Sequence, residues 1–308
     1  MSGDRPPKTA IERMIPLLLG VESNLDQDAS LESLARDFGQ STFAFHRSFS
    51  AAVGETPRKH VERLRLERAA LKLAITDDSV LEIAMAVGFN THETFSRAFL
   101  RRFGRAPRAY RQAAKVAQKE RLERNRTFRG EDCVLSDVRF EALPRTYLIS
   151  IRRLGAYADL DAETREALWR ELIDRAGRNG VLKSPVRMGF FPDDPGMTPP
   201  AMQRADLCIP VERPIESTDR VRCFRFAGGM HGVIEHVGAY STAGQAYRNL
   251  ADGIRASDRY IFRDAPPLQI FRQVHLGGDR SANHSEICFA VKRRSGAREG
   301  QETSRTAP

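Results

Sequence analysis

The 308-residue chain has little of what marks membrane, secreted or metal-binding proteins. Its four cysteines are scattered without a CxxC pair, which argues against a zinc site or a disulfide framework and fits a reducing cytoplasm. No apolar run reaches about 18 residues, and the apolar segment at 14–21 is too short and too acid-flanked for a signal peptide. We therefore expect a cytoplasmic protein with no metal ion, cofactor or membrane partner.

The chain does contain an internal repeat. The segment LARDFGQSTFAFHRSFSAAVGETP at 34–57 returns as IAMAVGFNTHETFSRAFLRRFGRAP at 83–107. Each copy has the pattern of a short helix, a tight glycine turn, a second helix and a Gly-x-x-Pro ending. This layout is typical of helix-turn-helix modules, which present their second helix to the DNA major groove. The sequence thus predicts two such modules in series.

Paired phenylalanines set the orientation of each second helix. Phe45 and Phe49 are four residues apart, as are Phe95 and Phe99, so each pair lies on one helix face and is expected to point inward. The positions on the opposite face are then the candidates that contact base edges. They are Thr42, Phe43, His46 and Arg47 in the first copy, and His92, Glu93, Ser96 and Arg97 in the second.

Local signals predict where these helices begin and end. Ser41 and Asn90 are suited to be N-caps, and Gly54 and Gly104 are suited to left-handed C-caps. The intervening segment 58–75 is typical of one continuous helix, with an apolar stripe at Leu64, Leu71 and Ile75. A rigid connector would fix the separation of the two reading helices, which must be about 34 Å for successive major grooves on one face of the duplex.

The distribution of charge supports a nucleic-acid partner. Residues 1–130 hold 23 Lys and Arg against 16 Asp and Glu, whereas residues 131–308 hold 26 against 24. The excess is concentrated in the repeat and just after it, where Arg97 to Arg129 contains twelve basic residues. Basic residues up to Arg111 are interpreted as phosphate contacts, and those from Lys115 to Arg129 as an exposed helix or linker.

Beyond residue 130 the pattern changes to alternating strands with two amphipathic helices. Strand-type runs occur at 145–157, 186–191, 205–212, 228–240, 268–276 and 285–293. The tripeptide Gly-Ala-Tyr at 155–157 recurs at 238–240, each time between a strand and a helix. We predict an α+β domain of duplicated strand-helix-strand-strand units that follows an all-α domain. Such a domain leaves a groove between its repeats, a common place for a small-molecule site.

Residues 8–112 resemble the DNA-binding domain of the AraC family of bacterial transcription regulators. The similarity covers about 100 residues and includes EIAMAVGFNTHETFSRAFLRRFGRAPRAYR at 82–111. The resemblance implies seven helices in two helix-turn-helix halves joined by a linker helix. It also implies that the base-reading positions are Phe43, His46 and Arg47 in the first half and His92, Glu93 and Arg97 in the second.

Residues 135–294 resemble the GyrI-like effector-binding domain of multidrug-sensing regulators. The segments that carry this resemblance are FFPDDP at 190–195, RADLCIPV at 204–211 and GGMHGVIEHVGAY at 228–240. In many members a glutamate lies at the base of the ligand cavity and attracts lipophilic cations. Gln269 occupies that position here, and a neutral amide offers no charge partner. A preference for cations is therefore not expected.

The predicted effector site consists of aromatic residues around Gln269 and would bind an aromatic or lipophilic molecule. Each residue also has a plainer interpretation: Trp169 as core packing, the tyrosines as strand-end anchors and the phenylalanines as core. The predicted site residues are Tyr157, Trp169, Phe190, Tyr240, Gln269 and Phe271.

Together these features favour a regulator that binds double-stranded DNA and is controlled by a small molecule. The resemblance to the AraC family implies that it activates transcription by contact with RNA polymerase. The alternatives are a DNA-binding regulator without a ligand, and a hydrolase like some GyrI-like proteins, for which Gln269 removes the general base. The domain boundaries are placed at 1–112 for DNA binding, 113–130 for a basic linker, 131–296 for the effector domain and 297–308 for a disordered tail.

Overall fold

The computed structural model describes residues 10–27, 29–125, 133–218, 220–273 and 283–294. The predicted tail at 297–308 and the end of the predicted linker lie outside these ranges. The N-terminal part is helical, and among the described residues no helix is long and apolar enough to cross a membrane. Its helices are α1 (Ala10–Ser23), α2 (Leu31–Asp37), α3 (Thr42–Val53), α4 (Pro57–Ile75), α5 (Val80–Ala86), α6 (His92–Phe103) and α7 (Pro107–Asn125).

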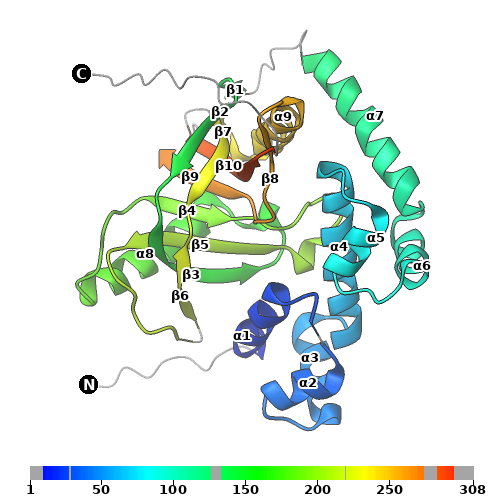
Figure 1. The fold of residues 1–308 in the computed structure, drawn as a ribbon. Helices are drawn as coiled ribbons and strands as arrows, with labels where there is room; N and C mark the ends of the chain where they lie inside the picture. Colours follow the sequence, from blue (N-terminus) through cyan, green and yellow to red (C-terminus); the bar gives the residue numbers. More distant parts are fainter. Residues whose placement is uncertain (1–9, 28, 126–132, 219, 274–282, 295–308) are drawn as a thin grey trace.

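The two helix-turn-helix units are α2–α3 and α5–α6, and they share the long helix α4 (Figure 1). Ser41 caps α3 through a bond from the Ala44 amide, as predicted. The N-cap of α6 is Thr91, whose hydroxyl accepts from the Thr94 amide, so the prediction of Asn90 was wrong by one residue. Gly54 ends α3 in the left-handed conformation, and α6 ends in the same way.

The connector helix differs from the prediction in its buried face. Leu64 is buried, but Leu71 is exposed and Ile75 is only partly buried. The actual stripe includes Leu66, Ala69, Ala70 and Leu73, which pack against α5 and α6. Helix α4 thus contributes to the cores of both halves. The predicted boundary at residue 112 falls inside α7, which continues without a break to Asn125.

The C-terminal part is built on one antiparallel sheet with two long helices. The main path of the sheet has the order β1-β7-β10-β9-β4-β5-β3-β6, and the central pair β4–β9 joins two similar halves. The strands are β1 (Cys133–Leu135), β2 (Arg139–Leu143), β3 (Thr146–Leu154), β4 (Arg187–Phe190), β5 (Arg204–Val211), β6 (Val221–Phe226), β7 (Gly229–Gly238), β8 (Tyr260–Phe262), β9 (Leu268–Gln273) and β10 (His284–Arg293).

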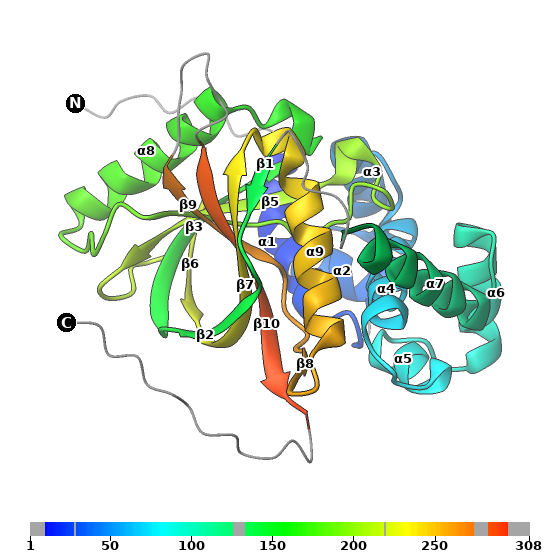
Figure 2. The ribbon, with the colours of Figure 1, turned by 90° about the horizontal axis from the view of Figure 1, so that it is seen from above.

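The predicted duplication is present in this sheet. Strand β3 leads through the short helix η1 (Tyr157–Asp159) into α8 (Ala162–Arg178), and β7 leads through η3 (Tyr240–Thr242) into α9 (Ala243–Ala256). Helix α8 packs on β3 and β5, and α9 packs on β7, β8 and β10 (Figure 2). The centre of the sheet, at β4 and β9, therefore lies between the two helices.

The two parts of the molecule are joined by buried ion pairs. Glu22 of α1 accepts from Arg152 of β3 at 2.6 Å and from Arg204 of β5 at 3.1 Å. Arg152 also binds Asp206, and Arg204 also binds Asp193. Burial raises the pKa of Glu22, but the charges of Arg204 and Arg152 outweigh it and the pKa is lowered. Glu22 is therefore ionised, and its carboxylate attaches helix α1 to the sheet.

A second contact reaches the connector helix. The Thr198 hydroxyl donates to Glu67 of α4 at 3.0 Å, and Arg63 donates to the same carboxylate at 3.0 Å. Burial raises the pKa of Glu67 above its ordinary value, more than the charge of Arg63 lowers it. Further along α4, Arg68 and Lys72 both bind Asp264 at 2.9 Å. The C-terminal half of the connector, from Glu67 to Lys72, is therefore held by the sheet domain.

Candidate nucleic-acid interface and effector site

The reading helices present the residues that the repeat predicts to face outward. Phe45, Phe49, Phe95 and Phe99 are fully buried, which fixes the orientation of α3 and α6. Seven of the eight candidate base-contacting residues are exposed and one, Ser96, is partly exposed. Phe43 is 76% exposed, and the Arg47 guanidinium carbon lies 5.7 Å from the centre of its ring. An exposed phenylalanine is costly in water and is suited to contact a thymine methyl group.

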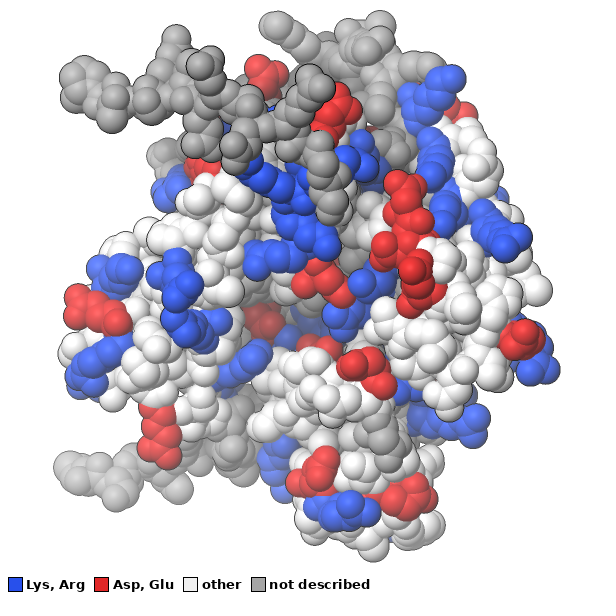
Figure 3. All heavy atoms as spheres, viewed as in Figure 1, with Lys and Arg blue, Asp and Glu red and all other residues white. Residues whose placement is uncertain are grey.

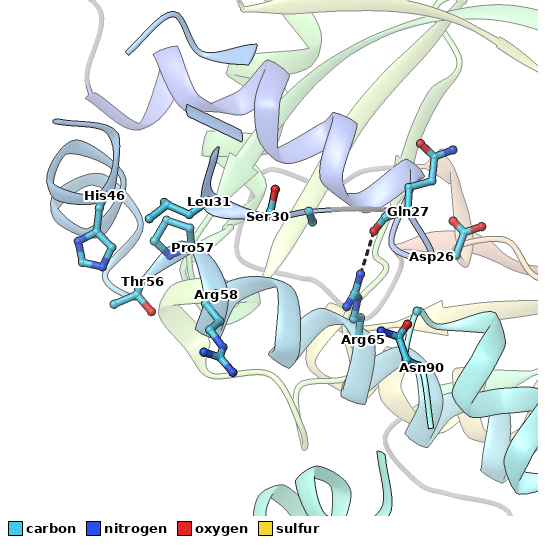
Figure 4. A pocket seen from close by; sticks show the side chains of 12 residues that line it. Asp26, Gln27, Ser30, Leu31, His46, Thr56, Pro57, Arg58, Arg65 and Asn90 are labelled. Carbon is cyan, nitrogen blue, oxygen red and sulfur yellow. Dashed lines mark hydrogen bonds between the residues drawn. The ribbon is translucent and has the colours of Figure 1, made fainter. Parts of the chain in front are cut away.

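A pocket of about 780 Å³ opens between α3, the loop that follows α1, helix α4 and the turn before α6. Figure 4 shows His46 of α3 at one end and Asn90, just before α6, at the other. Arg58 and Arg65, two turns apart on α4, lie between them. The charged residues that line the pocket are Arg58, Arg65 and Asp26, and residues of both units border it.

One of these arginines also holds the two units together. Arg65 donates to the backbone carbonyls of Leu25 at 2.8 Å and Gln27 at 2.9 Å. Gly88, in the turn of the second unit, has a φ of +88°, and a Cβ there would lie 2.5 Å from the Leu25 carbonyl oxygen and 2.9 Å from the Arg65 side chain. The turn of the second unit thus packs directly on the loop that follows α1.

Basic side chains extend along α7. Figure 3 shows Lys and Arg along the right-hand side of the view, over α7. Arg111 donates to the Asp78 carbonyl and Lys115 pairs with Asp77 at 3.0 Å, so part of the basic run fastens α7 to the loop after α4. Arg108 is exposed on the same helix. The run is therefore divided between internal contacts and the solvated surface.

In the C-terminal part, four of the predicted residues gather between α8 and α9. Trp169 is fully buried, and its ring centre lies 4.8 Å from that of Phe271. The ring centre of Tyr240 lies 5.6 Å from that of Phe271. Gln269, on the same face of β9 as Phe271, donates from Nε2 to the Ser285 hydroxyl at 2.9 Å. These residues form what we term the aromatic cluster: Trp169, Phe191, Tyr240 and Phe271, with Gln269 beside them.

Two predicted residues are placed differently. Phe190 points to the opposite face of the sheet, where it packs with Met188 and Ile270, because neighbouring residues of a strand alternate. Its place in the aromatic cluster is taken by Phe191, 6.5 Å from Phe271 and 5.4 Å from Tyr157. The prediction for Phe190 was therefore wrong by one residue.

Tyr157 borders the cluster but has a structural role as well. Its hydroxyl donates to the Arg204 carbonyl at 2.7 Å and accepts from the Asp193 amide at 3.2 Å. Burial raises the pKa of Tyr157 well above its ordinary value, and the charge of Asp193 adds to the rise. Since Arg204 binds Glu22, Tyr157 connects the cluster to the ion pairs that hold α1.

Several polar atoms near the cluster have no hydrogen-bond partner within the described part of the chain. They include the hydroxyls of Tyr240 and Tyr247 and the Nδ1 atom of His236. The Thr242 hydroxyl donates to the Ala239 carbonyl at 2.7 Å, so it accepts from Nε2 of His236, also at 2.7 Å. Nδ1 of His236 is then an acceptor, and burial lowers the pKa of this histidine. Unsatisfied buried polar atoms are costly, and a ligand that pairs with them recovers that cost.

Comparisons with known proteins agree with both halves of this description. Residues 34–113 match the model of a helix-turn-helix domain, and residues 136–292 match that of a GyrI-like small molecule binding domain. The regulatory protein SoxS of Escherichia coli is 32% identical over 95 residues, which cover 31% of this chain and 89% of SoxS. The chain belongs to the AraC family and carries a GyrI-like domain.

A longer relative in the AraC family is the transcriptional regulator Rob of Salmonella typhimurium, 26% identical over 186 residues. That match covers 59% of this chain and 62% of Rob, so the chain spans less than two thirds of this relative. Among solved structures, the DNA-binding domain of AdpA in complex with a target DNA is 26% identical, with a TM-score of 0.34. The match covers 35% of this chain and 97% of that one.

Sequence reasoning missed some members of both sites in this AraC-family chain. Arg58 and Arg65 were not singled out, because nothing in the local pattern distinguishes them from the other charged residues of the helix between the units. Phe191 of the aromatic cluster was missed, because Phe190 beside it was predicted instead. The described residues contain no group of three or more His, Cys, Asp or Glu side chains that could hold a metal ion.

Proposed function

We propose that the chain is a one-component transcription regulator in which the N-terminal domain reads DNA and the GyrI-like domain binds a small-molecule effector. The observation that carries the proposal is the orientation of α3 and α6, which bury their phenylalanines and expose polar and basic residues on the opposite faces. The proposed base-contacting residues are the eight named above. The proposal requires access to DNA, and hence the cytoplasm.

Arg47 and Arg97 are the sharpest test of DNA reading. Both are exposed on the reading faces, and arginine binds guanine with two hydrogen bonds. Arg47→Ala or Arg97→Ala should weaken specific binding by about 1–3 kcal/mol and relax the preference at one base pair. Binding would be measured at fixed salt on an operator selected from genomic fragments. If the double variant stayed within about twofold of the parent, the assignment of these helices would be wrong.

We infer that the effector site lies between α8 and α9 at Tyr157, Trp169, Phe191, Tyr240, Gln269 and Phe271. Packed aromatic side chains beside a few unpaired polar atoms are typical of sites for aromatic or lipophilic molecules. A thermal-shift screen of the full chain against a compound library would test this. A hydrolase is not favoured, because Gln269 is an amide bonded to Ser285 and supplies no general base.

Activation through RNA polymerase is proposed on family grounds and has one structural support. Leu81 and Met85, four residues apart on α5, are 53% and 52% exposed, so they form an apolar strip that the domain core does not use. Transcription in vitro with purified polymerase, comparing the parent with Leu81→Ser, would test this partner. Unchanged activation by that variant with normal DNA binding would exclude the strip as the contact.

A further inference from the structure

One segment of the sheet domain contacts both the aromatic cluster and the second helix-turn-helix unit. It connects β4 to β5, from Phe191 to Gln203, and we term it the β4–β5 segment. Phe191, at its start, belongs to the aromatic cluster. Further along, Met197 packs against the core of the second unit, and Thr198 binds Glu67 of α4. The same short segment therefore contacts both proposed sites.

Two residues of the segment make the contact with the second unit. The Arg102 guanidinium, in the last turn of α6, donates to the Met197 carbonyl at 2.8 Å. The Tyr110 hydroxyl of α7 donates to Met197 Sδ at 3.4 Å. Thr198 is only 2% exposed, and its hydroxyl donates to Glu67, which also binds Arg102 at 3.3 Å. Met197 and Thr198 thus contact α4, α6 and α7.

The buried side chain of Gln203 connects this contact to the effector site. Its Nε2 donates to the Thr198 carbonyl at 3.2 Å, and its Oε1 accepts from the Tyr157 amide at 2.8 Å. A carbonyl can only accept and a backbone N–H can only donate, so these two partners fix the orientation of the Gln203 side chain. A chain of hydrogen bonds therefore leads from Tyr157, at the border of the cluster, through Gln203 and Thr198 to Glu67 in the connector helix.

The β4–β5 segment has little conformational freedom of its own. Its sequence is FPDDPGMTPPAMQ at 191–203, and the ring of each of its four prolines fixes φ. The amides of Met197 and Thr198 both donate to the Asp194 carbonyl at 2.9 Å, which closes a turn around Pro195. A displacement at one end of the segment is therefore passed to the other end and is not absorbed within it.

The aromatic cluster is closed, so a ligand needs the room that a displaced ring provides. Trp169 and Phe271 are at most 5% exposed, whereas Tyr157, Phe191 and Tyr240 are partly exposed. A ring at the border moves more readily than one that is packed on all sides. Two of the three border rings, those of Tyr157 and Phe191, are attached to the β4–β5 segment. Their displacement by a ligand would move the segment.

We propose that the β4–β5 segment couples the effector site to DNA reading, so that a ligand in the aromatic cluster changes operator affinity through Met197 and Thr198. The inference rests on the function proposed above and names the connection by which it is regulated. Couplings of this kind change an affinity by about 5- to 150-fold, and they are reciprocal. Operator binding must therefore change the affinity of the effector site by the same factor.

Reciprocity provides a test that needs no identified effector. Trp169 is the single tryptophan of the chain and lies in the aromatic cluster, so its emission reports on this site. We would saturate the full chain with the operator duplex selected from genomic fragments and, separately, mix it with an unrelated duplex of equal length at the same salt. We expect the operator, but not the unrelated duplex, to change the emission of Trp169 and its quenching by acrylamide.

Variants of the segment test whether it carries this response. Thr198→Val removes the hydroxyl and keeps the shape of the side chain, so it should bind the operator and lose most of the Trp169 response. Thr198→Ser keeps the hydroxyl and should respond as the parent does. Met197→Ala, at a partly exposed position, shortens the other contact without altering a buried residue, and it should also reduce the response.

Asp264→Asn is the matched control for these variants. Asp264 also joins the sheet domain to α4, through Arg68 and Lys72, but it lies outside the β4–β5 segment. The control should keep the Trp169 response of the parent. Circular dichroism would confirm that each variant is folded.

The outcomes distinguish this inference from the function on which it rests. Specific operator binding by the parent with unchanged Trp169 emission would overturn the coupling and leave DNA reading in place. A response of parental size in both Thr198→Val and Met197→Ala would overturn the segment as the connection. Failure of the chain to bind any selected duplex specifically would overturn the DNA-reading function itself, and the inference with it.

Discussion

Gly88 is the residue at which the two helix-turn-helix units meet. Its backbone is left-handed, and the space where a side chain would begin is occupied by the Leu25 carbonyl and Arg65. Gly54 has a similar φ of +84°, but nothing lies within 4 Å of its Cβ position. Substitutions at Gly88 and Gly54 can therefore be compared to separate two contributions to the free energy of unfolding. One comes from the left-handed backbone conformation, and the other comes from the close contact that only Gly88 makes.

We expect Gly88→Ala to destabilise the protein by about 3 kcal/mol or more, because it combines backbone strain with a clash against backbone. Gly54→Ala should cost only about 1–2 kcal/mol, from the left-handed conformation alone. Denaturant unfolding of both variants would measure the difference. Equal losses would show that the close packing of Gly88 on the first unit contributes nothing to stability.

The wrong prediction for Phe190 shows that the type of a residue does not determine which face of a sheet its side chain occupies. Both residues of the Phe190–Phe191 pair are large and apolar, so alternation cannot tell which one faces the helices. Pairing with β9 decides it, because Phe190 lies opposite Leu268 and faces away from α8. By contrast, Trp169 and Phe271 came together as predicted, with ring centres 4.8 Å apart, although the run from Leu268 to Phe271 is buried on both faces of β9.

At the scale of elements, helix α6 illustrates a one-residue uncertainty with a measurable consequence. Asn90 and Thr91 are both good capping residues, and the sequence does not rank them. The structure assigns the cap to Thr91, whose Oγ1 accepts from the Thr94 amide at 3.2 Å. Asn90 lines the pocket bordered by α3, α4 and the turn before α6.

Thr91→Ala should therefore cost about 1 kcal/mol of stability, because it removes the cap of α6. Asn90→Ala should change stability by less than about 0.5 kcal/mol. Thermal melts of the two variants would compare them. A larger loss for Asn90→Ala would contradict the assignment of the cap to Thr91.

The connector α4 shows why periodicity alone was insufficient. A helix between two cores buries more than one stripe, so the predicted line through Leu64, Leu71 and Ile75 described a helix with a single buried face. Leu66 and Leu73 pack on the second unit, while Glu67 faces the sheet domain. The existence of the helices was predictable from local sequence patterns. The contacts of α4 with the sheet domain were not, because the pattern of one helix does not show which distant element packs on it.

At the scale of the molecule, Glu22 and Glu67 should respond to pH in opposite ways. The pKa of Glu22 is lowered in the fold, so its contribution is present above the ordinary value of 4.5 and is lost as the pH falls. The pKa of Glu67 is raised, so stability from this group is greatest below the ordinary value and decreases as the pH rises.

We expect Glu22→Gln to lower stability by about 3 kcal/mol at neutral pH, because it removes the carboxylate that two buried arginines share and leaves Arg152 and Arg204 with one carboxylate partner each. The deficit should shrink in acid, where the parent loses the same interaction. Glu67→Gln should cost less at neutral pH than Glu22→Gln. Melting temperatures from pH 4 to pH 8 would test the order, which a larger neutral-pH loss for Glu67→Gln would contradict.

The two reading faces also predict the shape of the DNA site. Thr42, Phe43, His46 and Arg47 differ in chemistry from His92, Glu93, Ser96 and Arg97, so one polypeptide should protect two unlike half-sites. Hydroxyl-radical footprinting of the monomer would show this. A strictly palindromic footprint that required a dimer would contradict it.

The single continuous helix between the units has a consequence for genomes. Because α4 is unbroken and its C-terminal half is docked on the sheet domain, the protein cannot stretch to follow a shifted half-site. One inserted base pair displaces the second half-site by about 3.4 Å and rotates it by about a tenth of a turn. Functional operators should therefore tolerate base changes at their edges far better than an insertion at their centre. The spacing between the two half-sites will identify the regulated genes more reliably than the base sequence of either half-site.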